Sequence, residues 1–475
     1  MTFEARGGAR RAMSLRHFST RQTPGAFWRV QPGAHFGFRP KLRFRLGVPS
    51  RLLVAGLFSE LLYLVLALSL PWWRYGGRLR RWAKLLGEGW GPFFACLAGI
   101  GLLMAAFGFG WRAVRQGGRG GRSEYRRLTW SFAFLFALTL FSLLPITADL
   151  FIYLSRAHLF TDLGQNPLRV ALLDVPDDRL VRAYATAYAA QPSMYGPAWL
   201  LFSAPATLGP HDVVGGVGYL KGLAAFAYLG SAWLLTRILR QVRPAAEGEG
   251  LIFFAWNPLV LLMAVGDGHN DALMMALVLL SLWLLLRERW GLALGVLVLS
   301  AWIKVVSLIF CPLFVLYVWQ RLRAQRHSCV ALAVGGGLAA AAGVSVLVLA
   351  PFWEPGLIYS FVERFFHPAN WHGAAAGMST GLLVAGLLLF GATYLLLAWR
   401  LAQGDGSFRQ LANASFGVAL LAFVLGAARS QPWHLLWAAS LAALSDRRWA
   451  MPVVAALSAL MLVAQVWIEW GLPGW

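Results

Sequence analysis

The sequence predicts an all-α polytopic membrane protein, and two observations support this fold class. Hydrophobic residues make up 59% of the 475 residues and charged residues only 13%, so the mean hydropathy is positive. Apolar runs that are long enough for membrane-spanning helices recur from residue 52 to residue 470. A water-soluble protein needs more polar side chains to cover its surface. We therefore expect one integral membrane domain over residues 52–475.

Thirteen apolar runs are predicted to form helices, within a range of eleven to fourteen that allows for broken or tilted segments. They are residues 52–70, 91–111, 128–146, 213–236, 251–265, 271–286, 290–303, 305–319, 330–350, 378–398, 411–428, 433–445 and 450–470. The run 195–209 has only fifteen residues and contains Pro197 and Pro205. We expect a re-entrant or interfacial helix there, which does not cross the membrane. The twenty-three Trp residues suit the belts at the two membrane interfaces.

Residues 1–51 form a basic tail that we expect to be disordered, because they carry eleven Lys or Arg residues against the single acid Glu4. Lys and Arg prefer the cytoplasmic side of the plasma membrane, which places the N-terminus inside. If residues 195–209 do not cross, most other basic clusters also fall inside. The loop 72–90 disagrees, since its five basic residues fall outside. The tail suits anionic lipid headgroups, and no nucleic-acid partner is expected without a folded recognition motif.

Polar residues that interrupt the apolar runs are predicted to meet on the outer face. The outer loop 147–212 has Asp149 near its start, and residues 266–271 (GDGHND) join the fifth and sixth helices. Lys304 lies between the seventh and eighth helices, and Arg429 lies between the eleventh and twelfth. Ionisable groups at membrane depth are costly, so their convergence at one face predicts a shared polar cavity.

Each of these residues also has a purely structural explanation. Asp149 stands where it can cap a helix as well as act in catalysis. Asn270 or Asp271 can cap the next helix within a simple turn. Pairing with an acid is the more common role for a lysine such as Lys304. Glu60, within the first helix, is better explained by an interhelical hydrogen bond than by a proton site.

An outer cavity of acids and cations suits the transfer of a sugar from a lipid-linked sugar phosphate. A carboxylate would take the proton of the acceptor hydroxyl as that oxygen attacks the anomeric carbon, and a cation would stabilise the leaving phosphate. The sequence contains neither of the two common loops that bind nucleotide phosphates, GxxxxGK(S/T) and a strand-linked GxGxxG. No cofactor is expected, although Asp267, His269 and Asp271 offer a weak site for a divalent cation.

Five stretches carry a resemblance to a known family: ADLFIYLSRAHLFTDLGQNPL, PSMYGPAWLLF, GDGHNDALMMALVLLSLWLL, SAWIKVVSLIFCPLFVL and SQPWHLLWAASLAAL. In this order the chain resembles the GT-C superfamily of polyprenyl-phosphate-sugar glycosyltransferases. Within that superfamily it is most similar to the bacterial polyprenol-phosphomannose-dependent α-1,6-mannosyltransferases. The resemblance implies inverting transfer of a hexose, such as mannose, to a glycan or lipid-linked glycan on the outer face.

The resemblance also implies roles for single residues. Asp149 would be the general base. The donor phosphate or the acceptor would contact Tyr195, His269, Asn270, Asp271, Lys304 and Arg429.

Two other classes of function compete with this interpretation. A transporter or flippase of polyprenyl-linked sugars would have inverted repeats and charges at the membrane midplane. No repeat is evident, and most charges lie at predicted helix ends. A non-catalytic membrane scaffold would tolerate replacement of Asp149 with little loss of stability.

Overall fold

The protein is described by a computed structural model over residues 47–75, 81–117, 122–175, 178, 189–208, 213–324, 330–359, 363, 380–425 and 431–471. Every regular element in these residues is a helix, and their extended backbone pairs only in an isolated bridge between Pro71 and Leu143. The predicted all-α class is confirmed. Residues 1–46 of the predicted basic tail lie outside the described residues.

Within the described residues, each predicted apolar run corresponds to a helical segment. The segments are α1 (Val48–Ser69), α3 (Trp90–Gln116), α4 (Arg122–Phe141), α8 (Val213–Val242), the broken segment α9 (Glu247–Ala255), α10 (Pro258–Leu261) and η5 (Leu262–Gly266), α11 (Asp271–Leu286), α12 (Trp290–Ile303), α13 (Cys311–Ala324), α14 (Val330–Leu349), α17 (Thr380–Ala402), α18 (Phe408–Leu425), α19 (Leu435–Ala442) and α20 (Ala450–Trp470).

Length and apolar composition decide which of these segments can cross a membrane. In the described part of the chain eight helices meet both requirements, and there are nine if the bent segment α9–α10–η5 counts as one span. The apolar helices α11 and α12 are shorter, with sixteen and fourteen residues. A polytopic helical membrane protein is therefore confirmed, while thirteen crossings remain a prediction.

The break between α9 and α10 has a local cause. Pro258 has no N–H to donate to the preceding turn, and the two helical pieces are bent by 53°. Asn257 occupies the break, where its side chain accepts from the Leu259 N–H at 3.0 Å and donates to Ser458 Oγ of α20 at 3.1 Å. The chain then runs through the π-helical turn η5, which ends at Gly266. The break thus places the turn before α11.

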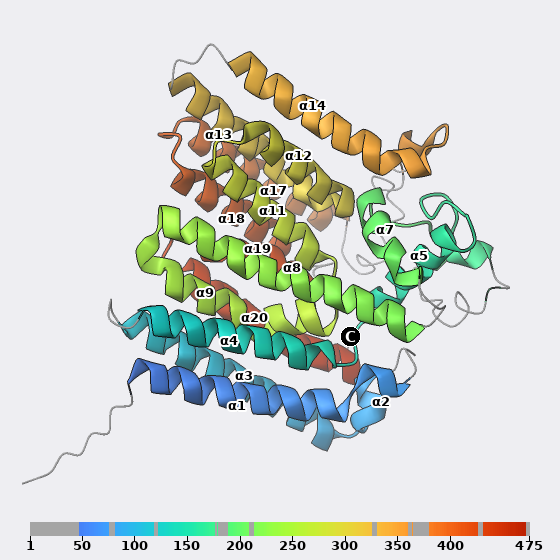
Figure 1. The fold of residues 1–475 in the computed structure, drawn as a ribbon, viewed down its shortest axis with the longest axis vertical. Helices are drawn as coiled ribbons and strands as arrows, with labels where there is room; N and C mark the ends of the chain where they lie inside the picture. Colours follow the sequence, from blue (N-terminus) through green and yellow to red (C-terminus); the bar gives the residue numbers. More distant parts are fainter. Residues whose placement is uncertain are drawn as a thin grey trace, which may run out of the picture. The chain divides into compact units, whose positions relative to one another are not determined.

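The loop between α4 and α8 forms short helices at one end of the long ones. It contains α5 (Asp149–Thr161), η2 (Leu172–Asp174), α7 (Pro197–Ser203) and η3 (Ala204–Thr207). Figure 1 shows α5 and α7 beside each other at this end. The seven residues of α7 extend about 10 Å at 1.5 Å per residue, which is too short to cross a membrane. The short length of α7 agrees with the prediction of a non-crossing helix over residues 195–209, which stays a prediction.

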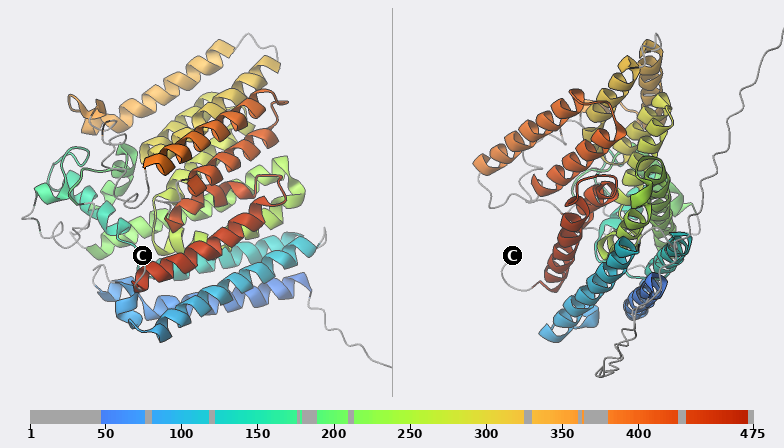
Figure 2. Two further views of the ribbon diagram at one scale, coloured as in Figure 1. Left: turned by 180° about the vertical axis from the view of Figure 1, so that it is seen from behind. Right: turned by 90° about the vertical axis from the view of Figure 1, so that its left-hand side faces the viewer.

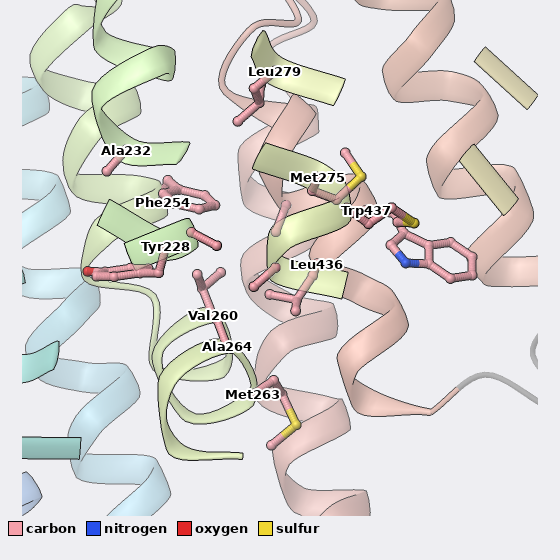
Figure 3. Packing of buried hydrophobic residues seen from close by; sticks show 14 of the residues in the cluster. Tyr228, Ala232, Phe254, Val260, Met263, Ala264, Met275, Leu279, Leu436 and Trp437 are labelled. Atoms are coloured by element: carbon pink, nitrogen blue, oxygen red, sulfur yellow. The ribbon is translucent and has the colours of Figure 1, made fainter. Parts of the chain in front are cut away.

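The long helices pack through apolar side chains. Tyr228 of α8, Phe254 of α9, Met263 of η5 and Leu279 of α11 belong to one buried cluster, which α19 enters through Leu436 (Figure 3). Helices that are distant in sequence also meet, since α20 lies beside α3 (Figure 2). A polar link joins α1 and α4, where Thr139 donates to Glu60 Oε1 at 2.5 Å. The expected interhelical role of Glu60 is therefore confirmed.

The basic loop 72–90, which the predicted topology did not explain, is fixed by contacts with distant segments. It contains η1 (Trp72–Tyr75) and α2 (Trp82–Leu86). The Trp82 N–H donates to Glu469 Oε1 at 2.5 Å, and Arg81 lies 3.9 Å from the same carboxylate. The Trp82 indole donates to the Leu144 carbonyl at 3.1 Å. The loop therefore joins the end of α20 to the segment that precedes Asp149.

The helix break yields a stability prediction. Asn257→Ala removes both hydrogen bonds of the buried amide, so we expect a loss of about 1–3 kcal/mol in the free energy of unfolding. Thermal unfolding in detergent measures the change. Ser458→Ala is the matched control, because it removes the interhelical bond and a local bond to the Val454 carbonyl but keeps the cap at Leu259, so it should cost less. Equal losses in both variants would show that the cap at Leu259 contributes nothing.

Candidate functional site

Asp149 is the first residue of α5, and it does not act as the cap of that helix. Ala148 occupies the capping position, and no side-chain hydrogen bond caps the helix. The Asp149 carboxylate instead accepts from the Tyr195 hydroxyl at 2.5 Å, and its second oxygen lies 3.8 Å from His269 Nδ1. The side chain is 15% exposed. Asp149 is therefore held by two residues from other segments and remains accessible.

Tyr195 reaches Asp149 because the chain beside it packs closely on the end of α12. The Gly196 N–H donates to the Ile303 carbonyl at 3.1 Å, and a Cβ at Gly196 would overlap the Trp302 carbonyl oxygen. Burial and the nearby Asp149 carboxylate hold the pKa of Tyr195 well above its ordinary value of 10. The hydroxyl therefore stays protonated and donates to Asp149.

The turn between η5 and α11 is shaped by glycine. Gly268 has a φ of +71°, and a Cβ there would also lie 2.6 Å from Leu150 Cδ1. This conformation turns His269 toward Asp149, and the imidazole stacks on Trp433 with 4.1 Å between ring centres. The neighbouring Asn270 accepts from the Tyr153 hydroxyl at 3.2 Å and makes no capping bond. The turn thus presents side chains to the site.

Asp271 and Lys304 form a buried ion pair. Lys304 Nζ lies 3.0 and 2.9 Å from the two oxygens of Asp271, which is fully buried. The Trp437 indole donates to the same carboxylate at 2.6 Å, and the Lys304 ammonium also lies over the Trp437 ring. The pairing expected for Lys304 is confirmed. The Lys304 side chain is still 20% exposed.

The structure brings six of the seven predicted site residues to one place. Asp149 contacts Tyr195 and His269, and Asn270 is linked to Tyr195 through Tyr153. Asp271 is the next residue in the chain after Asn270, and it pairs with Lys304. The seventh, Arg429, lies outside the described residues.

Of the three residues with metal-ligand spacing, His269 lies 3.4 Å from Asp267, but Asp271 faces other partners. Asp267 accepts from the Ile146 N–H at 2.5 Å, whereas the Asp271 carboxylate faces Lys304 and Trp437. In the described ranges no group of three or more His, Cys, Asp or Glu side chains is arranged to hold a metal ion.

Sequence reasoning missed several residues of the site. Tyr153 lies one helical turn after Asp149, so helical periodicity could have placed it on the same face. Trp433 and Trp437 were assigned to interfacial belts, but they contact His269 and Asp271. Lys221 was missed because it lies in an apolar run, and only the tertiary structure shows its buried contacts.

Comparison with known proteins shows the family of this chain. The family described as "Alpha-(1->6)-mannopyranosyltransferase, N-terminal domain" matches residues 53–321, which is more than half of the chain. The chain belongs to this family. The matched part includes all six described site residues, from Asp149 to Lys304. The family resemblance seen in the sequence motifs is therefore confirmed.

Two relatives show how far the similarity extends. The chain is 27% identical to α-(1→6)-mannopyranosyltransferase B of Corynebacterium glutamicum over 199 residues, which cover 40% of this chain and 33% of that relative. It is 24% identical to α-(1→6)-mannopyranosyltransferase A of Mycobacterium tuberculosis over 431 residues, 84% of this chain and 78% of that relative. The match thus spans only a third of the first relative and most of the second.

The close approach at Gly196 yields a second prediction. Gly196→Ala would force the start of α7 away from α12, because backbone atoms leave no room for the new methyl group. We expect the free energy of unfolding to fall by at least about 1–3 kcal/mol, measured by thermal unfolding in detergent. Gly222→Ala is the control, since a Cβ there meets no atom within 4 Å and alanine favours the α8 helix. Equal stability of the two variants would contradict the tight packing.

Proposed function

We propose that this chain is a membrane glycosyltransferase of the inverting type. It moves a mannosyl group from a polyprenyl-phosphate-mannose donor to a glycan or lipid-linked glycan acceptor, with Asp149 as general base. The observation that carries the proposal is the Asp149 carboxylate, partly exposed and held by Tyr195 and His269, in a chain of the α-(1→6)-mannopyranosyltransferase family. The two relatives support mannose as the sugar and an α-(1→6) linkage through their names.

The contacts of Asp149 suit a general base. Its Oδ1 accepts from Tyr195, which keeps the carboxylate in one orientation, while Oδ2 lies 3.8 Å from His269 and has no closer partner in the described residues. A base must come within hydrogen-bond reach of the proton that it takes, and a free, partly exposed oxygen meets that requirement. Asp271 is less suitable, because it is fully buried and both oxygens contact Lys304.

The proposed reaction is a single displacement. The acceptor hydroxyl oxygen forms a bond to the anomeric carbon as Asp149 takes the hydroxyl proton. The bond from that carbon to the phosphate oxygen breaks, and its electron pair leaves with the polyprenyl phosphate. Attack opposite the leaving group inverts the anomeric configuration. Because the donor already carries an activated sugar, the residues only position the reactants, move one proton and stabilise charge.

Cations near Asp149 would stabilise the leaving phosphate. Lys304 is partly exposed and has three N–H donors, so it could contact an anion while it keeps its ion pair with Asp271. We assign Arg429 to the same task from the sequence. Tyr195, His269, Asn270 and Asp271 would orient the donor or the acceptor. The proposal includes no cofactor, and it leaves a divalent cation on the donor phosphate open.

The proposed place of the reaction is the outer face of the plasma membrane. Basic residues gather at the helix ends opposite the site, such as Arg115 at the end of α3 and Arg240 at the end of α8. Lys and Arg prefer the cytoplasmic side, which supports a cytoplasmic N-terminus and a catalytic loop outside. In this orientation residues 1–51 are the cytoplasmic tail, and residues 52–475 form the transferase domain around the outer loop 147–212. The other proposed partner is the lipid bilayer, and no nucleic acid is expected.

Replacing the proposed base is the first test. Asp149→Asn keeps the size of the side chain but cannot accept the proton, so we expect transfer to fall by about 10²- to 10⁴-fold. Membranes that contain the variant are supplied with radiolabelled polyprenyl-phosphate-mannose and a membrane extract as acceptor. Asp162→Asn, the same change at the end of α5, is the control and should leave transfer near the wild-type level. Equal transfer by Asp149→Asn and wild type would show that another residue is the base.

A second test separates the pairing of Lys304 from a contact with the donor. Lys304→Gln leaves the buried Asp271 charge without its cation, which should destabilise the protein by about 3–5 kcal/mol. Adding Asp271→Asn removes that charge, so thermal stability should recover in the double variant. If Lys304 contacts the donor phosphate, transfer by the double variant stays below that of Asp271→Asn alone although stability returns. Recovery of both would reduce Lys304 to a structural partner and contradict its proposed role.

A further inference from the structure

Lys221 is a fully buried lysine that no step of the proposed reaction uses. It lies on α8, and its ammonium donates to the Leu143 carbonyl at 2.8 Å and to the Gly266 carbonyl. Leu143 follows the end of α4, and Gly266 is the last residue of η5. Carbonyl groups at the ends of helices lack helical partners and carry partial negative charge. One ammonium therefore joins the ends of two helical segments.

Asp267 joins the same two segments from the side of the turn. It is 1% exposed, and its Oδ1 accepts from the Ile146 N–H at 2.5 Å. Its Oδ2 lies 3.4 Å from His269 Nε2, and Thr147 Oγ1 lies 3.3 Å from the same nitrogen. The turn that carries His269 is thus attached to the stretch that leads to Asp149.

The stretch 142–148, between the end of α4 and the start of α5, depends on these contacts. Three of its backbone groups have no helical partner and are hydrogen-bonded by side chains of other segments. The Leu143 carbonyl accepts from Lys221, the Leu144 carbonyl accepts from Trp82, and the Ile146 N–H donates to Asp267. Buried backbone groups without partners are costly, so loss of a partner favours movement of the stretch. Asp149 follows directly and would move with it.

We propose that Lys221 and Asp267 are positioning residues, which set the distance between Asp149 and His269 by joining residues 143–146 to residues 266–267. The catalytic part of this inference rests on the proposed function. Neither residue touches the reacting atoms. The effect of Lys221 passes through the backbone, and that of Asp267 passes through the backbone and through its contact with His269. A displacement of about 1 Å at a catalytic group can lower the rate about 100-fold.

The variants separate positioning from general stability. Lys221→Met keeps a long side chain without the donor, and Asp267→Ala removes the acceptor for Ile146. Asp267→Asn keeps an oxygen that can accept the same hydrogen bond, so it should behave nearly as wild type. Tyr228→Phe is the matched control, because it removes another buried donor of α8, whose hydroxyl binds the Ala255 carbonyl of α9.

The first readout does not require any activity. Hydrogen–deuterium exchange of the full-length protein in detergent, followed by mass spectrometry, reports the opening of residues 143–150. We expect exchange there to rise about tenfold in Lys221→Met and Asp267→Ala, as loss of a buried hydrogen bond predicts. Asp267→Asn and Tyr228→Phe should exchange as wild type does. Unchanged exchange in the first two variants would overturn the inference.

The second readout is kcat per folded molecule in the mannosyl-transfer assay. Lys221→Met and Asp267→Ala should lower kcat about 10- to 100-fold with KM within about threefold, while Asp267→Asn keeps most of the activity. A purely structural role would lower the amount of folded protein and leave kcat per molecule unchanged, which would overturn the catalytic part. If the wild type transfers no mannose, the proposed function fails, and the exchange measurement still decides whether these residues hold the stretch.

Discussion

Buried backbone groups that lack a helical partner must find one inside the protein, and this requirement organises the site. The helices are interrupted after α4 and after η5, so the stretches 142–148 and 266–270 both contain such groups. Lys221 donates to carbonyls of both stretches, and Asp267 accepts from an N–H of the first. Asp149 and His269 follow these stretches directly, so the interactions that satisfy the backbone also bring the two side chains together.

The two acids of the site have different surroundings and therefore different capacities. Asp271 is fully buried and is bound by the Lys304 ammonium and the Trp437 indole, an arrangement that offsets the cost of burying its charge. Asp149 is partly exposed and receives one hydrogen bond, from Tyr195. The first environment maintains a fixed charge, and the second leaves an oxygen free to take a proton. This difference supports the choice of Asp149 over Asp271 as the base.

Much of the candidate site could be predicted because polar residues stand out in an apolar sequence. Asp149, His269, Asp271 and Lys304 each interrupt or end an apolar run, and they converge as expected. Tyr153 and Trp437 were not predicted, since aromatic residues are common at membrane interfaces and carry no comparable signal. The cap roles considered for Asp149 and Asn270 were wrong, because both side chains hydrogen-bond across the site rather than to their own helices.

By itself the sequence determined the helical membrane class and the segments that form helices, since hydrophobicity and proline act locally. Only the tertiary structure decided how the loop 72–90 is held, through Trp82 and Glu469, which are 387 positions apart in the chain. It also decided that Lys221 faces two backbone carbonyls, and that Tyr195 rather than a neighbour reaches Asp149. Such contacts depend on which helices pack together, and hydrophobic periodicity is nearly the same for every helix in a membrane.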